Sequence, residues 1–147
     1  MEKKVLPNDL LLGEVSRLVE EGEAVTLMTK GVSMLPFIVG GRDSVVLEKP
    51  GELEPGMIVL AEVSKGIYVL HRIIAVEGDK VTLMGDGNLA GVERCRKEDV
   101  KAVAVRILKP GKEIDINGKS HQRHARMWKS LLPVRRWILA VYRRLFI

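Results

Sequence analysis

The chain has 147 residues, of which 46% are hydrophobic, 29% are charged and 4% are aromatic, which fits one domain whose core is filled by aliphatic side chains. Its single cysteine, Cys95, excludes an internal disulfide framework, and no cysteine–histidine spacing typical of a zinc site is present. The net charge of +5 is uneven: residues 1–115 carry 16 basic and 19 acidic side chains, whereas residues 116–147 carry 8 basic ones and no acid. This asymmetry predicts a separate role for the C-terminal segment, with an anionic partner.

Residues 1–23 predict a short helical segment. Asn8 or Asp9 can cap a helix whose apolar residues recur at helical spacing through residues 10–19, and Gly22 ends it. Because one side of this helix is apolar, we expect it to pack against the core. The first four residues lead only into a run of three leucines, so we expect neither an export signal nor a membrane-spanning anchor.

Residues 24–118 predict a β domain. Apolar residues alternate or run continuously in several short segments, and turn-forming pairs rich in glycine and proline separate these segments. Many short strands at such spacing are typical of a coiled antiparallel sheet or a partly open barrel. The expected strands cover residues 24–30, 42–48, 56–61, 67–76, 81–84, 100–107 and 113–116.

A serine follows the first of these strands on a turn that the sequence makes stiff. Gly31 interrupts the alternation, and Pro36 fixes its own φ angle and disfavours a helical conformation at Leu35. A serine in such a place can present its Oγ atom at the surface, where an attacking nucleophile must lie. Ser33 is therefore a candidate nucleophile, and an ordinary turn serine is the alternative interpretation.

Two further segments place polar groups within or directly after apolar strands. His71 and Arg72 interrupt the β-branched run of residues 67–76, and Gly85-Asp86-Gly87-Asn88 follows the next strand. Taken separately, the histidine is read as a buried structural residue and the arginine as a paired or solvated charge. Asp86 taken separately is an ordinary turn former, because aspartate bonds its own backbone in such turns.

The order Ser33-Met34-Leu35-Pro36, then His71-Arg72 in a strand, then Gly85-Asp86-Gly87-Asn88 resembles the signal peptidase I and LexA-type superfamily of serine peptidases. The resemblance covers about residues 24–108. Many members of the superfamily use a lysine as the general base, and the histidine in this chain is similar to the branch with a Ser-His pair. The resemblance implies the coiled sheet of that superfamily, with Ser33 as the nucleophile and His71 as the base.

The chemistry of these residue types supports the same roles. A serine hydroxyl is a weak nucleophile until a neighbouring base takes its proton, and imidazole titrates close to neutral pH. The base also needs orientation, usually from a carboxylate or carbonyl group on its other nitrogen. In the Ser-His branch a further aspartate serves this purpose, and this chain has none at that position. We therefore expect Asp86 to orient His71, with Glu93 as the alternative, and the Ser33 N–H group to donate to the oxyanion.

Residues 119–147 predict a basic amphipathic helical tail, broken once at Pro133. Arg135-Arg136 and Arg143-Arg144 are expected on one side of the helix, and apolar residues occupy much of the remainder. This composition is typical of a peripheral membrane anchor, and the longest uncharged run, residues 137–142, is too short to span a bilayer. A helix docked on its own sheet or on a partner is an equal alternative. Nucleic acid ranks lower as a partner, because no recognition motif accompanies the basic residues.

Three functions from different classes remain open. The first is a serine endopeptidase that binds a peptide or protein precursor as an added strand and cleaves it with a Ser33–His71 dyad. The second is a non-catalytic peptide-binding module on the same fold. The third is a self-cleaving regulator of the LexA type, ranked last because the first 30 residues are too short for a helix-turn-helix domain. We expect no cofactor and no metal, and a cytoplasmic location in which the tail lies at a membrane surface or on the protein itself.

Overall fold

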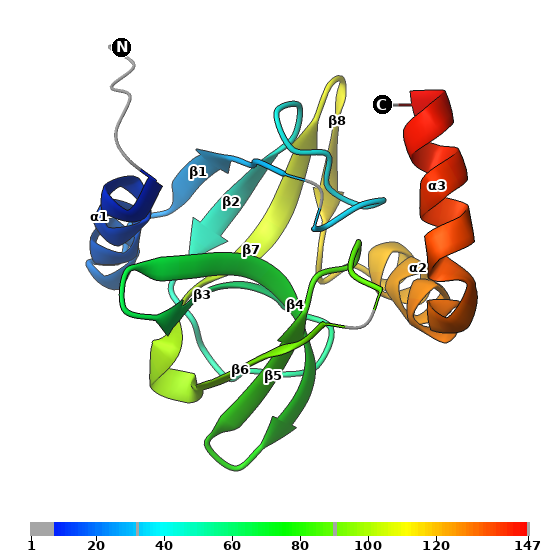
Figure 1. The fold of residues 1–147 in the computed structure, drawn as a ribbon. Coiled ribbons are helices and arrows are strands. Elements are labelled where there is room, and N and C mark those ends of the chain that lie inside the picture. Colours follow the sequence, from blue (N-terminus) through cyan, green and yellow to red (C-terminus); the bar gives the residue numbers. More distant parts are fainter. Residues whose placement is uncertain (1–7, 32, 90, 147) are drawn as a thin grey trace.

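An antiparallel sheet forms most of the structure, with one helix before it and two helices after it (Figure 1). The computed structural model describes residues 8–31, 33–89 and 91–146. In chain order the elements are α1 (Asn8–Glu20), β1 (Val25–Met28), β2 (Ser44–Glu48), β3 (Ile58–Ser64), β4 (Ile67–Glu77), β5 (Lys80–Met84), β6 (Glu93–Arg96), the 3₁₀ helix η1 (Lys97–Asp99), β7 (Val100–Lys109), β8 (Lys112–Asp115), α2 (Lys119–Ser130), the 3₁₀ helix η2 (Leu132–Val134) and α3 (Arg135–Phe146).

The strands follow one another across the sheet in the order β1-β2-β7-β3-β4-β5-β6, and β8 pairs with β7 outside this path. Every pairing is antiparallel, and the ladders around β7, β3 and β4 contain register shifts. Such irregularities increase the local twist and let a sheet curl. The two ends of the path, β1 and β6, do not pair, so the sheet is not closed. The expected antiparallel architecture is confirmed at this level.

The first four residues of β3 are buried on both faces, which explains their uninterrupted apolar sequence. Ile58 and Leu60 belong to the core that α1 covers, whereas Val59 and Ala61 belong to a second core on the opposite face. All four side chains are at most 1% exposed. Successive strand residues point to opposite faces, so one continuous apolar run supplies both cores. Helix α1 contributes to the first core through Leu12, Val15 and Val19, as its apolar spacing predicted.

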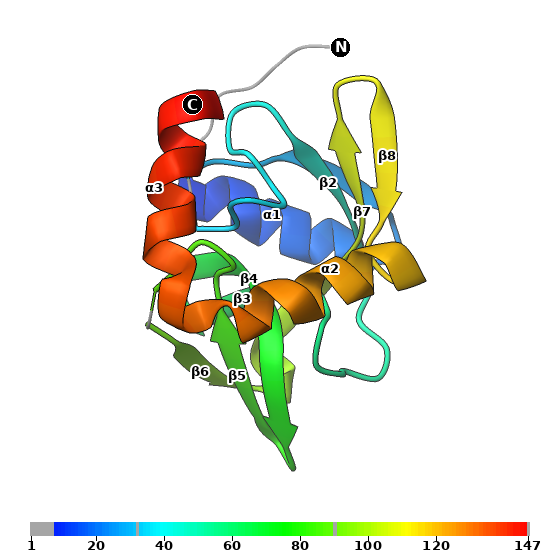
Figure 2. The same cartoon turned by 90° about the vertical axis from the view of Figure 1, so that its right-hand side faces the viewer.

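The C-terminal segment forms two helices, because Pro133 interrupts the helical hydrogen bonding within η2. Trp128 of α2 and Leu139 of α3 pack with Leu35 and Val39, so both helices contact the segment that follows Ser33. Figure 2 shows α2 crossing in front of the sheet and α3 running at a steep angle to α2 along one side of the molecule. No helix in the described ranges is both long enough and apolar enough to cross a bilayer.

Two details of the sequence prediction are wrong. Strand β6 was not expected, because its sequence Glu-Arg-Cys-Arg lacks an apolar alternation and the strand is held through backbone pairing with β5. Arg135 and Arg136 do not share the solvent side of α3, since Arg135 is only 4% exposed. Consecutive helical residues are separated by about 100° of rotation, so one of this pair lies inward while the other is exposed.

Candidate active site

Ser33 lies on a tight turn that follows β1 and is anchored in the core. Met34 and Leu35, the next two residues, are 4% and 0% exposed. The N–H groups of Phe37 and Ile38 both donate to the Met34 carbonyl oxygen, at 3.1 and 3.0 Å, and close the turn. Ser33 itself is partly exposed. The turn therefore holds a serine at the surface on a backbone that the core fixes.

Three glycines hold the backbone around this turn. Gly31 has a φ angle of +77°, a conformation that favours glycine. A Cβ atom on Gly40 would lie 2.2 Å from the Gly31 carbonyl oxygen, so the two backbone segments touch. The Gly41 N–H group also donates to the Thr29 carbonyl oxygen at 2.8 Å. The position of Ser33 thus depends on backbone contacts that a larger residue at position 40 would break.

The turn after β5 lies directly against the Ser33 turn. The Gly87 N–H group donates to the Ser33 carbonyl oxygen at 2.7 Å. A Cβ atom on Gly85 would lie 2.4 Å from that same oxygen and 3.1 Å from His71 Nε2. The absence of a side chain at position 85 is therefore what allows the Ser33 turn and the His71 ring to approach each other.

Ser33 and His71 line one cleft of about 200 Å³, which we call the Ser33 cleft. Its walls come from α1, β1, the Ser33 turn, β3 and β4, and His71 at its edge is 7% exposed. The structure thus brings the expected nucleophile and the expected base to one place. No hydrogen bond joins their side chains in the described part of the chain. Catalytic hydrogen bonds are often long without substrate and tighten when it binds.

Glu93, rather than Asp86, contacts His71. An oxygen of the Glu93 carboxylate, at the start of β6, pairs with His71 Nδ1. This pairing leaves the other ring nitrogen, Nε2, next to Gly85 and the Ser33 turn. When Nδ1 carries the proton, the Nε2 lone pair can accept one, which is the tautomer that a general base needs. The sequence analysis placed Glu93 second to Asp86, and in the structure it is Glu93 that contacts His71.

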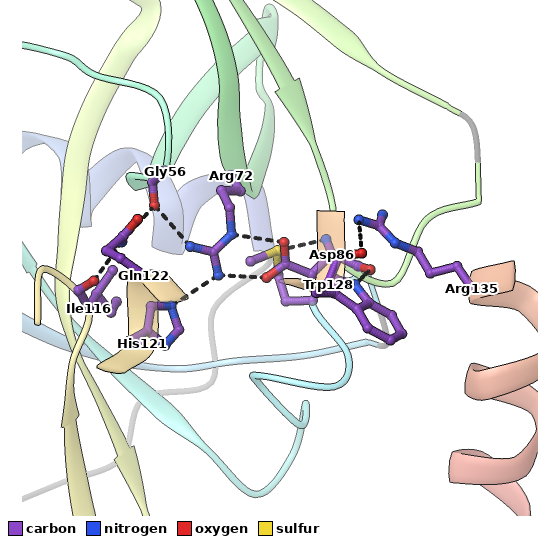
Figure 3. A network of polar contacts seen from close by, with 9 residues as sticks. Gly56, Arg72, Asp86, Ile116, His121, Gln122, Trp128 and Arg135 are labelled. Carbon is purple, nitrogen blue, oxygen red and sulfur yellow. Dashed lines mark hydrogen bonds and ion pairs between the residues drawn. The ribbon is translucent and has the colours of Figure 1, made fainter. Parts of the chain in front are cut away.

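Asp86 binds Arg72 instead. The two carboxylate oxygens accept hydrogen bonds from Arg72 at 2.9 and 2.8 Å, and the side chains are 5% and 7% exposed. Arg72 also donates to the Gly56 carbonyl oxygen at 2.9 Å (Figure 3). Adjacent strand residues point to opposite faces, so His71 faces the Ser33 cleft while Arg72 faces α2. Asp86 therefore neutralises a buried guanidinium and does not orient the histidine.

Two residues of α2, which the sequence analysis did not single out, complete the network around Arg72. His121 Nε2 accepts a hydrogen bond from Arg72 at 3.1 Å, and the Trp128 indole N–H group donates to the Asp86 carbonyl oxygen at 2.6 Å (Figure 3). His121, Ala125 and Trp128 are the buried residues of α2. Their spacing is that of one helix face, which is the only sequence signal that could have indicated them.

Burial, together with the Arg72 guanidinium beside it, lowers the pKa of His121 from 6.5 to about 4. The imidazole is therefore neutral near pH 7, as its role as an acceptor from Arg72 requires. Protonation would place two cations in contact within a buried site, and the fold resists it for that reason.

Comparisons with known proteins assign no family to this geometry. No protein-family model matches the chain, and no curated protein sequence is a significant match. Within the described ranges, no group of three or more His, Cys, Asp or Glu side chains is arranged to hold a metal ion.

We expect acid to destabilise the fold through His121. In the unfolded chain this histidine takes up a proton near pH 6.5, whereas the folded protein keeps it neutral down to about pH 4. The free energy of unfolding should therefore fall by about 1–3 kcal/mol as the pH drops between these values. Urea unfolding at a series of pH values should show that His121→Gln removes this part of the dependence.

His124→Gln is the matched control, because His124 lies on the exposed side of the same helix. This variant should keep the full loss of stability in acid. An unchanged pH slope in His121→Gln would contradict the assignment.

Proposed function

We propose that the chain is a serine endopeptidase that cleaves a peptide or protein precursor with Ser33 as nucleophile, His71 as base and Glu93 as the group that orients His71. The observation that carries this proposal is the cleft that Ser33 and His71 share, with a carboxylate on the far nitrogen of the histidine. The three residues come from the turn after β1, from β4 and from β6. The open antiparallel sheet and the order of the motifs support a fold of the signal peptidase–LexA type.

In the proposed reaction His71 Nε2 takes the proton from Ser33 Oγ as this oxygen attacks the carbonyl carbon of the scissile bond. The carbonyl oxygen becomes an oxyanion, to which the Ser33 backbone N–H group donates. The protonated histidine then gives its proton to the leaving amine, the C–N bond breaks and an ester remains on Ser33. Water, deprotonated by His71, hydrolyses this ester and restores both side chains.

The walls of the Ser33 cleft support binding of an extended peptide. Within the described ranges, β1 pairs only with β2, and residues 69–71 of β4 pair only with β3, so each segment has a free edge. Both segments line the cleft. A peptide can add to such an edge as a further strand through its main chain. The volume of about 200 Å³ and the apolar walls favour small apolar side chains beside the cut.

A non-catalytic peptide-binding module is the second candidate. It is favoured by one observation, namely that Ser33 and His71 are not hydrogen-bonded to each other in the described part of the chain. The same cleft and the same free edges would serve such a module. The two functions differ in one measurable property, which is covalent reactivity at Ser33.

We further propose that α3 contacts the surface of an anionic membrane. Trp137, Val141 and Leu145 are 64%, 57% and 68% exposed, and residues four apart lie on the same side of a helix. The helix has no acidic residue in its sequence. An exposed apolar stripe beside cations is typical of helices that lie in the membrane interface. Its exposed cations are Arg136, Arg143 and Arg144.

Ser33→Ala should abolish covalent labelling by a fluorophosphonate probe and cleavage of a proteome-derived peptide library, because the attacking oxygen is removed. We expect the rate to fall by at least about 10³-fold, measured by gel fluorescence and by mass spectrometry of new peptide termini.

Ser64→Ala, at the exposed end of β3, is the control and should react like the unmodified chain. Equal labelling of Ser33→Ala would refute Ser33 as the nucleophile. A folded wild-type chain that neither labels nor cleaves would favour the binding module.

Glu93→Gln and Asp86→Asn should separate orientation of the base from stability. Glu93→Gln removes the carboxylate from His71, so labelling of Ser33 should slow by about 10²–10⁴-fold with little change in the unfolding midpoint. Asp86→Asn leaves Arg72 buried without a counter-ion, so the free energy of unfolding should fall by about 3 kcal/mol. Labelling rates per folded molecule and urea unfolding midpoints test both. The opposite pattern would restore Asp86 as the orienting acid.

Removing the apolar stripe should weaken membrane binding. The unmodified chain should co-sediment with phosphatidylglycerol vesicles and not with phosphatidylcholine vesicles, and the double change Trp137→Ser and Val141→Ser should reduce the affinity at least about 10-fold. Ile67→Ser is the control, because Ile67 is 57% exposed but lies in β4. Equal vesicle binding by the double variant would exclude α3 as the contact surface.

A further inference from the structure

A second cleft lies on the side of β4 that Arg72 faces, and we call it the α2 cleft. It has a volume of about 320 Å³, and its walls come from β4, the end of β5, α2, η2 and the first residue of α3. Among the described residues, none lines both this cleft and the Ser33 cleft. His71 and Arg72 are adjacent in β4, so the two clefts stand on either side of one strand. The proposed peptidase chemistry makes no use of the α2 cleft.

The α2 cleft carries an excess of positive charge. Among its described lining residues, the only carboxylate is Asp86, whose two oxygens already accept hydrogen bonds from Arg72. Three further cations, Arg126, Lys129 and Arg135, line the cleft and form no ion pair within the described ranges. Residues 116–147 contain no acid, so α2, η2 and α3 have no counter-ion of their own to offer. The local field therefore favours an anion from outside the chain.

Arg135 is the most deeply buried of these three cations. It is 4% exposed, and its Nη1 and Nη2 atoms donate only to backbone carbonyl oxygens. Nη1 donates to Asn88 at 3.1 Å, and Nη2 donates to Trp128 at 3.5 Å, the contact that Figure 3 draws. Its Nε atom is buried without any hydrogen-bond partner. Burial lowers the pKa of Arg135, which reflects the cost of keeping this charge away from water. A buried guanidinium whose hydrogen-bond partners are all neutral is costly, and an anion close to this guanidinium would offset that cost.

The setting of Arg135 adds to the attraction for an anion. Arg135 is the first residue of α3, whose first turn has no acidic residue. The N-terminal N–H groups of a helix carry partial positive charge and bind phosphate groups in many proteins. Arg126 and Lys129 of α2 are exposed and lie at the mouth of the cleft, while Arg135 lies inside it. Cations therefore line the cleft both at its mouth and in its interior.

Apart from Gly56 and the polar side chain of Gln122, the remaining walls of the α2 cleft are apolar. They are formed by Pro55, Ile73, Ile74, Met84, Ala125 and Leu132. These walls add no carboxylate to that of Asp86, and they provide a surface for an apolar group attached to the anion. Three unpaired cations match the double charge of a phosphate group better than the single charge of a carboxylate.

We propose that the α2 cleft binds a phosphate group, with Arg135 as its inner ligand and Arg126 and Lys129 as its outer ones. The phosphate group can belong to free phosphate or to the headgroup of a phospholipid. The apolar walls can contact the acyl chains of a phospholipid, whereas free phosphate has no apolar group to place there. If Arg135 served only to hold Trp128 and Asn88 in place, it would need no anion, and no phosphate binding would be expected.

Trp128 provides the readout. Its ring lies 5.1 Å from the Arg135 guanidinium, and the chain has one other tryptophan, Trp137, on the exposed face of α3. In a Trp137→Phe background, the fluorescence therefore reports on Trp128 alone. Sodium phosphate is titrated at constant ionic strength, with chloride making up the difference. We expect a saturable change with phosphate and none with chloride.

Arg135→Gln should weaken phosphate binding at least 10-fold, and Arg136→Gln is its matched control. The two residues are neighbours and the charge change is the same, but Arg136 is exposed and does not line the cleft. Arg136→Gln should therefore bind like the parent protein. A non-saturable response in the parent, or equal affinity in Arg135→Gln and Arg136→Gln, would overturn the proposal.

Exposed residues at the mouth keep the test decisive if Arg135→Gln does not fold. Lys129→Gln and Arg126→Gln change solvent-exposed side chains of α2. Each should fold normally and weaken phosphate binding 3-fold or more. Parental affinity in both variants would exclude this cleft as the binding site.

A soluble short-chain lipid identifies the source of the phosphate group. Dihexanoyl phosphatidic acid is titrated below its micelle concentration, with dihexanoyl phosphatidylcholine as the zwitterionic control. Affinity at least 10-fold above that of inorganic phosphate assigns a lipid headgroup, and similar affinity assigns free phosphate. Binding of phosphatidylcholine as tight as that of phosphatidic acid would show that charge does not direct the binding, and the proposal would fail.

Discussion

The buried ion pair between Arg72 and Asp86 is the contact on which the arrangement of both clefts depends. Arg72 follows His71 in β4, and Asp86 follows Gly85 in the next turn, so the pair fixes the strand and the turn relative to each other. Removing one partner of such a pair leaves an uncompensated buried charge and costs about 3–5 kcal/mol. The pair therefore sets the position of Gly85. The Ser33 turn and the His71 ring both lie against this glycine.

Two neighbouring residues of β4, His71 and Arg72, have different roles because they face opposite sides of the sheet. His71 and Arg72 are consecutive, yet they face opposite sides of β4 because strand side chains alternate. The histidine lies at a cleft with a serine and keeps one ring nitrogen on a glutamate. The arginine donates to groups from the turn after β5, from α2 and from the segment before β3. The histidine–arginine pair in the sequence is thus one motif with two separate roles.

The C-terminal helices combine structural anchoring with unpaired positive charge. Trp128 and Leu139 pack against the segment after Ser33, and His121 accepts from Arg72, so α2 and α3 support the candidate active site from behind. The same helices contain no acidic residue, and the free energy needed to keep each of their cations in place depends on how far it is buried. An exposed arginine is solvated by water, whereas a buried one must find a partner. Arg136 and Arg135, adjacent in the chain, are examples of the two cases.

The sequence by itself determined the features that depend on near neighbours. Alternating and continuous apolar runs indicated seven of the strands, helical spacing indicated α1, and Gly31 and Pro36 indicated the stiff turn at Ser33. These patterns are set by the pleat of a strand, the pitch of a helix and the allowed φ angles, all of which act over a few residues. Only the tertiary structure decided that Glu93 pairs with His71, that Asp86 neutralises Arg72 and that Arg135 lies inside. Those outcomes join residues distant in the chain, and which carboxylate reaches which cation depends on how the sheet curls, a property that no local pattern records.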